Sequence, residues 1–285
     1  MIYKATNLEY QILAKDDSCQ KEYPLLRANN GTKEIRQISP IHCRSYLIAQ
    51  MPNGRYVISK GNGLGYSKHN FLYTLEMPTD VWGLLLKEDA LRDFYCGQDV
   101  QALWIKTNQM ECVLELDYPL YIEKTGKVVN PVLLQYNVEC PYRIADAPFM
   151  NDVFIWNEVS KWERYNTKAY QQEYLIAADV LIHNLRIMHD HKILHNALTN
   201  ENLTWALELL DFELTRTPQH PYTKEDYERH AEDYYSREIL DIYRIIHYIA
   251  GVLHQDMDYN IVDDLFKEYG FDLKSLTIEN KKDAE

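Results

Sequence analysis

The sequence predicts an α+β fold in which an antiparallel sheet with one helix is followed by a helical half. Two patterns indicate it: short β-like runs between residues 33 and 136, and apolar repeats of helical period between residues 168 and 253. The 285 residues are enough for one large or two modest domains with a buried core. We expect the sheet half over residues 1–138, the helical half over 139–273, and a flexible polar tail over 274–285.

The β-like runs of the first half are short and are separated by turn residues. Asn53 and Gly54 supply the positive φ values that a tight hairpin turn requires, so the runs on either side of them should pair. The strands expected in this antiparallel sheet are residues 33–38, 45–50, 55–60, 101–106, 112–116 and 131–137.

A single helix is expected to interrupt these strands at residues 81–95. Leu84, Glu88, Leu91 and Tyr95 recur there at the spacing of one helical face. In the second half, two longer helices are expected, and the second of them is almost wholly apolar and should be buried. The elements predicted there are helices at 168–189 and 238–253, with short β-like pieces between them at 203–205 and 208–210.

Composition and charge exclude several classes of protein. The formal charge of −13 opposes binding to the phosphate backbone of nucleic acid. No stretch reaches the roughly 18 apolar residues of a membrane span, and the start of the sequence has no apolar signal core. The five cysteines are scattered without a Cys-x-x-Cys pair, so neither a disulfide framework nor a cysteine zinc site is indicated. We expect a soluble, cytoplasmic protein.

The stretch from residue 193 to 216 carries the most specific pattern. His195 follows the end of a predicted helix, Asn202 comes seven residues later, and Asp211 nine residues after that. This spacing resembles the His-Arg-Asp-x-x-x-x-Asn loop and the following Asp-Phe-Gly of the protein-kinase-like superfamily. The resemblance implies a two-lobed fold with ATP and Mg²⁺ in the cleft, His195 as the loop histidine, and Asn202 and Asp211 as metal ligands. Both offer the oxygen ligands that Mg²⁺ prefers.

Features upstream agree with this resemblance. Residues 57–60, Val-Ile-Ser-Lys, are similar to the Val-Ala-Ile-Lys strand of kinases, whose lysine pairs with nucleotide phosphates and with a helix glutamate. In this resemblance Lys60 corresponds to that lysine. Glu88 is the preferred candidate for its partner, and Glu76 is the alternative because the interval from Lys60 to Glu88 is long for the superfamily.

Glycines directly after Lys60 are a further candidate for nucleotide binding. Gly61 and Gly63 could cradle a phosphate, although glycine runs are more often simple turns. A cleft of this kind must offset four phosphate charges in an acidic protein. Mg²⁺ and Lys60 would supply most of the positive charge, with Lys68 or Arg44 as helpers. The hinge that meets the adenine is expected near residues 135–140.

Three departures from the kinase pattern are equally informative. Ala197 stands where the catalytic aspartate is expected, residues 39–44 contain no glycine in the place of the glycine-rich loop, and Glu213 replaces the glycine of Asp-Phe-Gly. A positioned general base contributes about 10²–10⁴-fold. Because phosphoryl transfer depends mostly on positioning and metal electrostatics, loss of the base predicts a slow catalyst and not necessarily a dead one.

The loop from His195 to Asn202 is also similar to the His-Gly-Val-Met-Asn-Thr-Asp-Asn loop of selenoprotein-O-type pseudokinases, which lack the same aspartate and transfer AMP. The favoured hypothesis is an ATP- and Mg²⁺-binding, atypical phosphoryl- or AMP-transferase acting on a protein or small-molecule acceptor. The alternative is a non-catalytic pseudokinase that serves as a regulatory or interaction module. A third hypothesis, an accidental likeness, predicts that Lys60 does not lie near Asp211.

Overall fold

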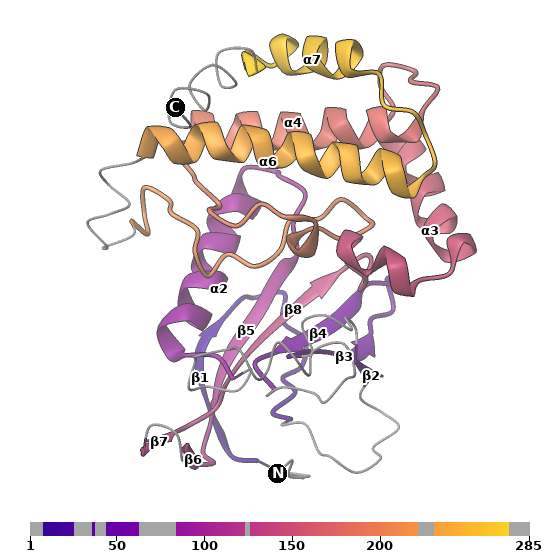
Figure 1. Cartoon of the computed structure of the whole chain (residues 1–285). Coiled ribbons are helices and arrows are strands. Elements are labelled where there is room, and N and C mark those ends of the chain that lie inside the picture. The colour runs from indigo at the N-terminus through magenta and orange to yellow at the C-terminus, as the bar shows by residue number, and fades with distance from the viewer. Residues whose placement is uncertain are drawn as a thin grey trace.

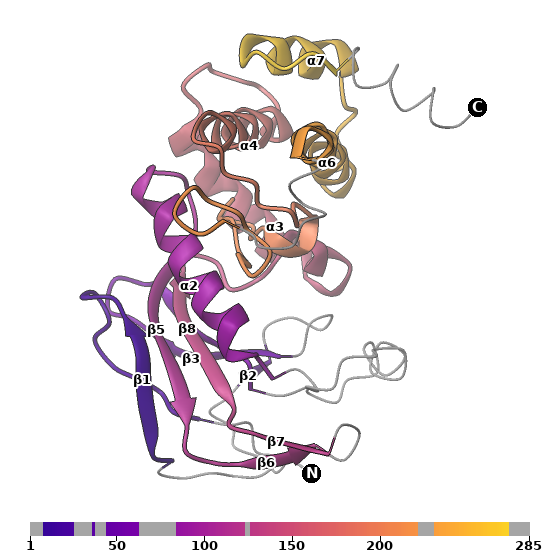
Figure 2. The same cartoon turned by 90° about the vertical axis from the view of Figure 1, so that its left-hand side faces the viewer.

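A computed structural model describes residues 8–25, 36–37, 44–62, 84–122, 126–221 and 231–273. The described chain is a mixed α+β structure, as predicted. Figures 1 and 2 show the sheet at one end of the molecule, the long helices α4 and α6 at the other, and helix α2 alongside the sheet. The predicted tail at 274–285 lies outside the described residues.

The larger sheet has six strands in the order β1-β5-β8-β4-β3-β2, and every neighbouring pair is antiparallel. Its central strands β8 and β4 are largely buried, and Lys60 is the last residue of β4. The β3–β4 hairpin pairs Gln50 with Tyr56 across a turn in which Gly54 has φ +86°, as the Asn-Gly signal predicts. The strands are β1 (Tyr10–Lys15), β2 (Arg36–Gln37), β3 (Ser45–Gln50), β4 (Tyr56–Lys60), β5 (Gln109–Leu116) and β8 (Val132–Val138). A separate hairpin pairs β6 (Leu120–Ile122) with β7 (Lys127–Val129).

Helix α2 spans Lys87–Ala102, later in the chain than the predicted 81–95. Its buried face contains Ala90, Asp93, Phe94 and Gly97, whereas Glu88 and Tyr95 are exposed. This face was missed because two of its members are small and one is charged, so the apolar spacing is weak. The strand predicted at 101–106 is wrong: the helix continues to residue 102, and the chain then turns.

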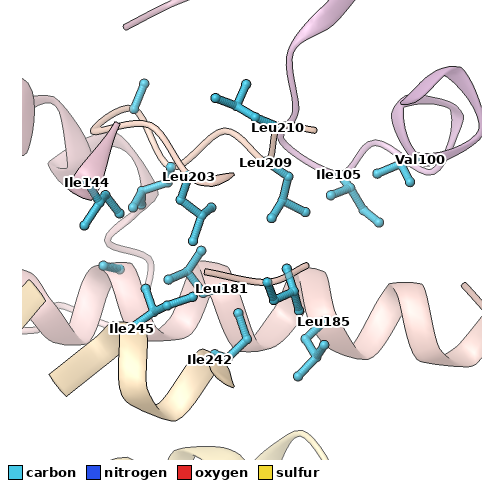
Figure 3. Packing of buried hydrophobic residues seen from close by; sticks show 14 of the residues in the cluster. Val100, Ile105, Ile144, Leu181, Leu185, Leu203, Leu209, Leu210, Ile242 and Ile245 are labelled. Carbon is cyan, nitrogen blue, oxygen red and sulfur yellow. The ribbon is translucent and has the colours of Figure 1, made fainter. Parts of the chain in front are cut away.

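The long helices α4 and α6 pack against each other and enclose most of the core of the helical half. In Figure 3, Leu181 and Leu185 of α4 lie near Ile242 of α6 and below Leu209 of the following segment. None of the described helices combines the length and apolar character needed to cross a bilayer. The α-helices of this half are α3 (Asp152–Val159), α4 (Glu173–Asp190), α6 (Ala231–Val252) and α7 (Tyr259–Glu268), and the 3₁₀ turns are η1 (Ile144–Phe149), η2 (Ser160–Tyr165) and η3 (Asn200–Asn202).

The segment between α4 and α6 contacts both the sheet half and the helical half. The β-like pieces predicted at 203–205 and 208–210 form isolated bridges, between Leu203 and Leu209 and between Thr204 and Arg143. Leu209 also pairs in parallel with Thr107, in the loop between α2 and β5. These bridges fix the segment that leads to Asp211 against the loop between α2 and β5.

Candidate functional site

Lys60, at the end of β4, is the centre of a buried ionic cluster. Its side chain is 2% exposed, and its Nζ lies 2.7 Å from Asp93 Oδ2, 2.7 Å from Asp211 Oδ1 and 2.8 Å from Glu213 Oε1. Lys60 and Asp211 are 151 residues apart in the chain. An accidental likeness to kinases predicts that these two residues lie apart, and their direct contact argues against that hypothesis.

Asp93, on the buried face of α2, is the helix carboxylate that pairs with Lys60. The pairing predicted for Glu88 is therefore corrected: Glu88 lies on the exposed side of the first turn of α2, and Glu76 lies outside the described residues. Asp93 also accepts the backbone N–H of Phe212 at 2.9 Å. One carboxylate thus ties α2 both to the sheet and to the segment that carries Asp211.

A second cation, Arg44, completes the cluster from the residue before β3. Its Nη2 lies 3.0 Å from Glu213 Oε1 and 3.7 Å from Asp211 Oδ2. Three carboxylates therefore face two cations. One oxygen from each of Asp93, Asp211 and Glu213 lies within 4.8 Å of the others, a spacing that could hold a metal ion. Sequence reasoning noted Arg44 only as a helper and treated Glu213 only as a departure, because neither sits in a motif that indicates a charge partner.

Burial and charge act in opposite directions on the ionisable groups of this cluster. Burial opposes the charge on Lys60, but Asp211, Asp93 and Glu213 outweigh it and hold the pKa of the ammonium above its ordinary value. Burial likewise opposes ionisation of Asp211, yet Lys60, Arg44 and Arg143 hold its pKa well below the usual range. For Asp93, burial outweighs the attraction of Lys60 and raises the pKa to about 6, with Asp211 and Glu213 adding to the rise.

Asn202 and Arg143 lie on the helical side of the same site. The backbone carbonyl of Asn202 accepts the N–H of Leu210 at 2.9 Å, which places Asn202 beside the residue that precedes Asp211. Its amide donates to Ala197 O at 3.0 Å, and its Oδ1 accepts from Arg143 Nη1 at 3.4 Å. The two predicted metal positions are thus held on neighbouring backbone segments, with the Arg143 guanidinium against Asn202.

His195 is fully buried and supports the segment before Asp211. Its Nε2 donates to Leu210 O at 3.0 Å, and its ring centroid lies 5.1 Å from that of Phe212. Burial lowers the pKa of the imidazole, which is therefore neutral. These contacts make His195 a positioning residue. Asp211 itself has φ +68°, a strained value for a residue other than glycine, and the bonds around it hold that conformation.

Gly61 is required by the backbone at the end of β4. It has φ +94°, and a Cβ at this position would clash with the carbonyl oxygen of Val132 on β8. Its N–H donates to Arg44 O at 3.0 Å, so it also places Arg44 beside the cluster. Gly63, the other glycine predicted to contact phosphate, lies outside the described residues.

The space expected to receive an adenine, beside residues 135–140, is narrow. A cavity of about 10 Å³ lies there between the sheet and the helical half, lined by described residues of both. The backbone N–H groups of Glu139 and Cys140 donate to Glu208 Oε2 at 2.9 and 3.5 Å, so these hinge donors are occupied. The small cavity is lined by Ser45, Ile58, Tyr136, Val138, Cys140, Pro141, Arg143, Thr204 and Leu210.

Comparison with known proteins gives a distant structural similarity and no family match. No protein-family model and no curated protein matches the chain. Among solved structures, the chain is similar to the kinase domain of a rhoptry antigen of Toxoplasma gondii, with a TM-score of 0.38 and 11% identity. The match covers 73% of this chain and 63% of that one, so the chain spans less than two thirds of the kinase-domain chain.

Proposed function

We propose that this protein is kinase-like, with lobes at 1–138 and 139–273, and that it binds Mg²⁺·ATP in the cleft and transfers phosphate or AMP slowly to a protein or small-molecule acceptor. The observation that carries the proposal is the buried contact of Lys60 with both Asp93 and Asp211 at 2.7 Å. A strand lysine, a helix carboxylate and a carboxylate after the Asn202 loop are the three parts that orient phosphates and metal in kinases.

The donors present in the cluster fit Mg²⁺ and a polyphosphate. Asp211, Asn202 and Glu213 supply the oxygen atoms that would hold Mg²⁺, which when bound neutralises charge on the phosphates. Lys60 and Arg44 would bind phosphate oxygens. The three N–H donors of the Lys60 ammonium are all taken by carboxylates. Glu213 is the carboxylate most able to leave, because its side chain is 18% exposed while that of Asp93 is 1% exposed.

The missing general base sets the expected rate. With Ala197 in place of the catalytic aspartate, a kinase turnover of about 1–100 s⁻¹ is reduced by about 10²–10⁴-fold. The expected turnover is on the order of 10⁻⁴ to 1 s⁻¹.

Isothermal titration with ATP and Mg²⁺ tests the proposal. Wild-type protein should bind ATP only with Mg²⁺, Asp211→Asn should lose that binding, and the exposed control Asp117→Asn should keep it. Circular dichroism establishes that each variant is folded. An absence of binding by the wild type, or unchanged binding by Asp211→Asn, refutes the proposal. ATP labelled at the α or γ phosphate then separates AMP transfer from phosphate transfer.

The second candidate is a non-catalytic pseudokinase that acts as a regulatory or interaction module. The narrow cavity of about 10 Å³ where an adenine is expected and the occupied N–H groups of Glu139 and Cys140 favour it. It predicts that neither ATP nor Mg²⁺ changes the melting temperature and that no label is transferred to any acceptor.

A further inference from the structure

Trp104 occupies a position that neither backbone conformation nor packing explains. Helix α2 ends at Ala102, and Trp104 is the second residue beyond it, with φ +61° and its N–H bonded to Gln101 O at 3.0 Å. Glycine is the residue that fits this left-handed position after a helix without strain. The Trp104 side chain is nevertheless 96% exposed, whereas Trp162 and Trp205 are 1% and 0% exposed. The indole is displayed to solvent at a cost in strain.

A cavity of about 570 Å³ opens beside this indole. Its walls come from Asp16 after β1, Gln98 and Gln101 of α2, the loop residue Lys106, and Glu139. None of the residues of the Lys60 cluster lines it. The volume lies in the range of sites that receive a small molecule or a partner's side chain. The cavity therefore meets the expected hinge at Glu139 but contains none of the ionic cluster around Lys60.

The charges lining the cavity leave one carboxylate without a cation. Glu139 pairs with Lys106 at 2.9 Å, with Arg55 at 3.5 Å and with Arg164 outside the lining. The buried Glu208 pairs with Arg55 at 2.9 Å. Asp16 instead accepts hydrogen bonds from neutral donors alone: the backbone and hydroxyl of Ser18 at 2.9 and 2.6 Å, and Gln98 Nε2 at 2.8 Å. No ion pair is found for Asp16 within the described ranges, so among the carboxylates of the lining it is Asp16 that lacks a cation partner.

An exposed indole and an uncompensated carboxylate on one cavity both attract a cation. The indole face binds it through its quadrupole, and a planar guanidinium can stack on the ring while it donates to a carboxylate. The chain's charge of −13 also favours encounter with a basic partner. We propose that the Trp104 cavity docks an arginine side chain from a basic segment of a partner protein.

A titration with a matched pair of peptides tests this proposal. The probes are acetyl-Gly-Gly-Arg-Gly-Gly-amide and the same peptide with citrulline, which has the shape of arginine without its charge. The full chain is labelled with ¹⁵N tryptophan, and Trp104→Phe identifies the Trp104 indole signal by its loss. The arginine peptide should shift that signal in a saturable, salt-sensitive way, and the citrulline peptide should not. Equal shifts from the two peptides, or no shift from either, overturn the proposal.

Two asparagine variants locate the charge that matters. Asp16→Asn should weaken binding of the arginine peptide by about 5-fold or more, since a charge-assisted hydrogen bond becomes a neutral one. Asp17→Asn makes the same change at the exposed neighbouring residue and should leave the dissociation constant unchanged. Equal effects of the two variants would show that only the net charge of the protein is sensed, and the docking proposal would be wrong. ATP titrations of the same samples report separately on the nucleotide site.

Discussion

Asp93 is buried between Lys60 and the backbone of Phe212, and its replacement by asparagine should change how stability depends on pH. Asparagine has the same shape and stays neutral at every pH. It can still accept the Phe212 N–H that Asp93 accepts at 2.9 Å. The main difference between the two proteins is therefore the charge that Asp93 acquires as the pH rises.

The size of the effect comes from the pKa of Asp93. Its value is about 6 in the folded protein and about 3.9 in an unfolded chain. The folded protein thus holds the proton more tightly, so stability that is fully present below about pH 3.9 is lost as the pH rises through about 6. At 1.36 kcal/mol for each unit of difference between the folded and unfolded pKa values, the total loss reaches about 3 kcal/mol. The Asp93→Asn variant does not lose this stability, because asparagine stays neutral.

Urea denaturation followed by circular dichroism at pH 4, 5, 6, 7 and 8 measures this directly. The free energy of unfolding of Asp93→Asn should rise by about 2 kcal/mol relative to the wild type from pH 4 to pH 8, mostly before pH 7, since part of the total loss already occurs below pH 4. A constant offset between the curves comes from the altered hydrogen bond to Lys60 and does not matter. Asp117→Asn, at an exposed aspartate, should run parallel to the wild type. Parallel curves for Asp93→Asn would refute the reasoning, and a change of opposite sign would mean that the ion pair with Lys60 outweighs burial.

Three further changes test the site and its surroundings. Asp211→Asn should lower the free energy of unfolding by about 1–3 kcal/mol at pH 7, because it removes one of the carboxylates that face the buried Lys60 and leaves a neutral hydrogen bond in place of a charge-assisted one; since the folded-state pKa of Asp211 is depressed, the difference should shrink as the pH falls below about 4 in urea titrations. Gly61→Ala should cost about 2–5 kcal/mol from left-handed strain and a clash with the Val132 carbonyl, against about 1–2 kcal/mol for Gly54→Ala, which has φ +86° and open space; equal losses in thermal denaturation would contradict the clash. Trp104→Gly should raise the free energy of unfolding by about 0.5–1 kcal/mol through relief of strain, and a clear loss would mean that the indole packs against the protein.

Local patterns carried the broad architecture. The hairpin around Gly54 and helices α4 and α6 were predictable, because turn chemistry and apolar periodicity act over a few residues. Helix α2 lies later in the chain than predicted, and Asp93, its carboxylate that pairs with Lys60, was missed for a related reason. Its buried face includes Ala90, Asp93 and Gly97, and a face made of small and charged residues gives no apolar signal. Strand β1 and helices α3 and α7 were not predicted at all.

Lys60 and Asp211 could be found from sequence because each belongs to a short motif of fixed spacing. Their contact with each other, across 151 residues, required the folded chain. The choice of Asp93 in place of Glu88 depends on the rotation of α2 against the sheet, which side-chain packing sets. Glu213 pairs with both Lys60 and Arg44. These ion pairs form between charges that come together only when the folded chain buries them. Short-range spacing determined which residues carry the chemistry, while long-range packing and electrostatics determined how they are paired.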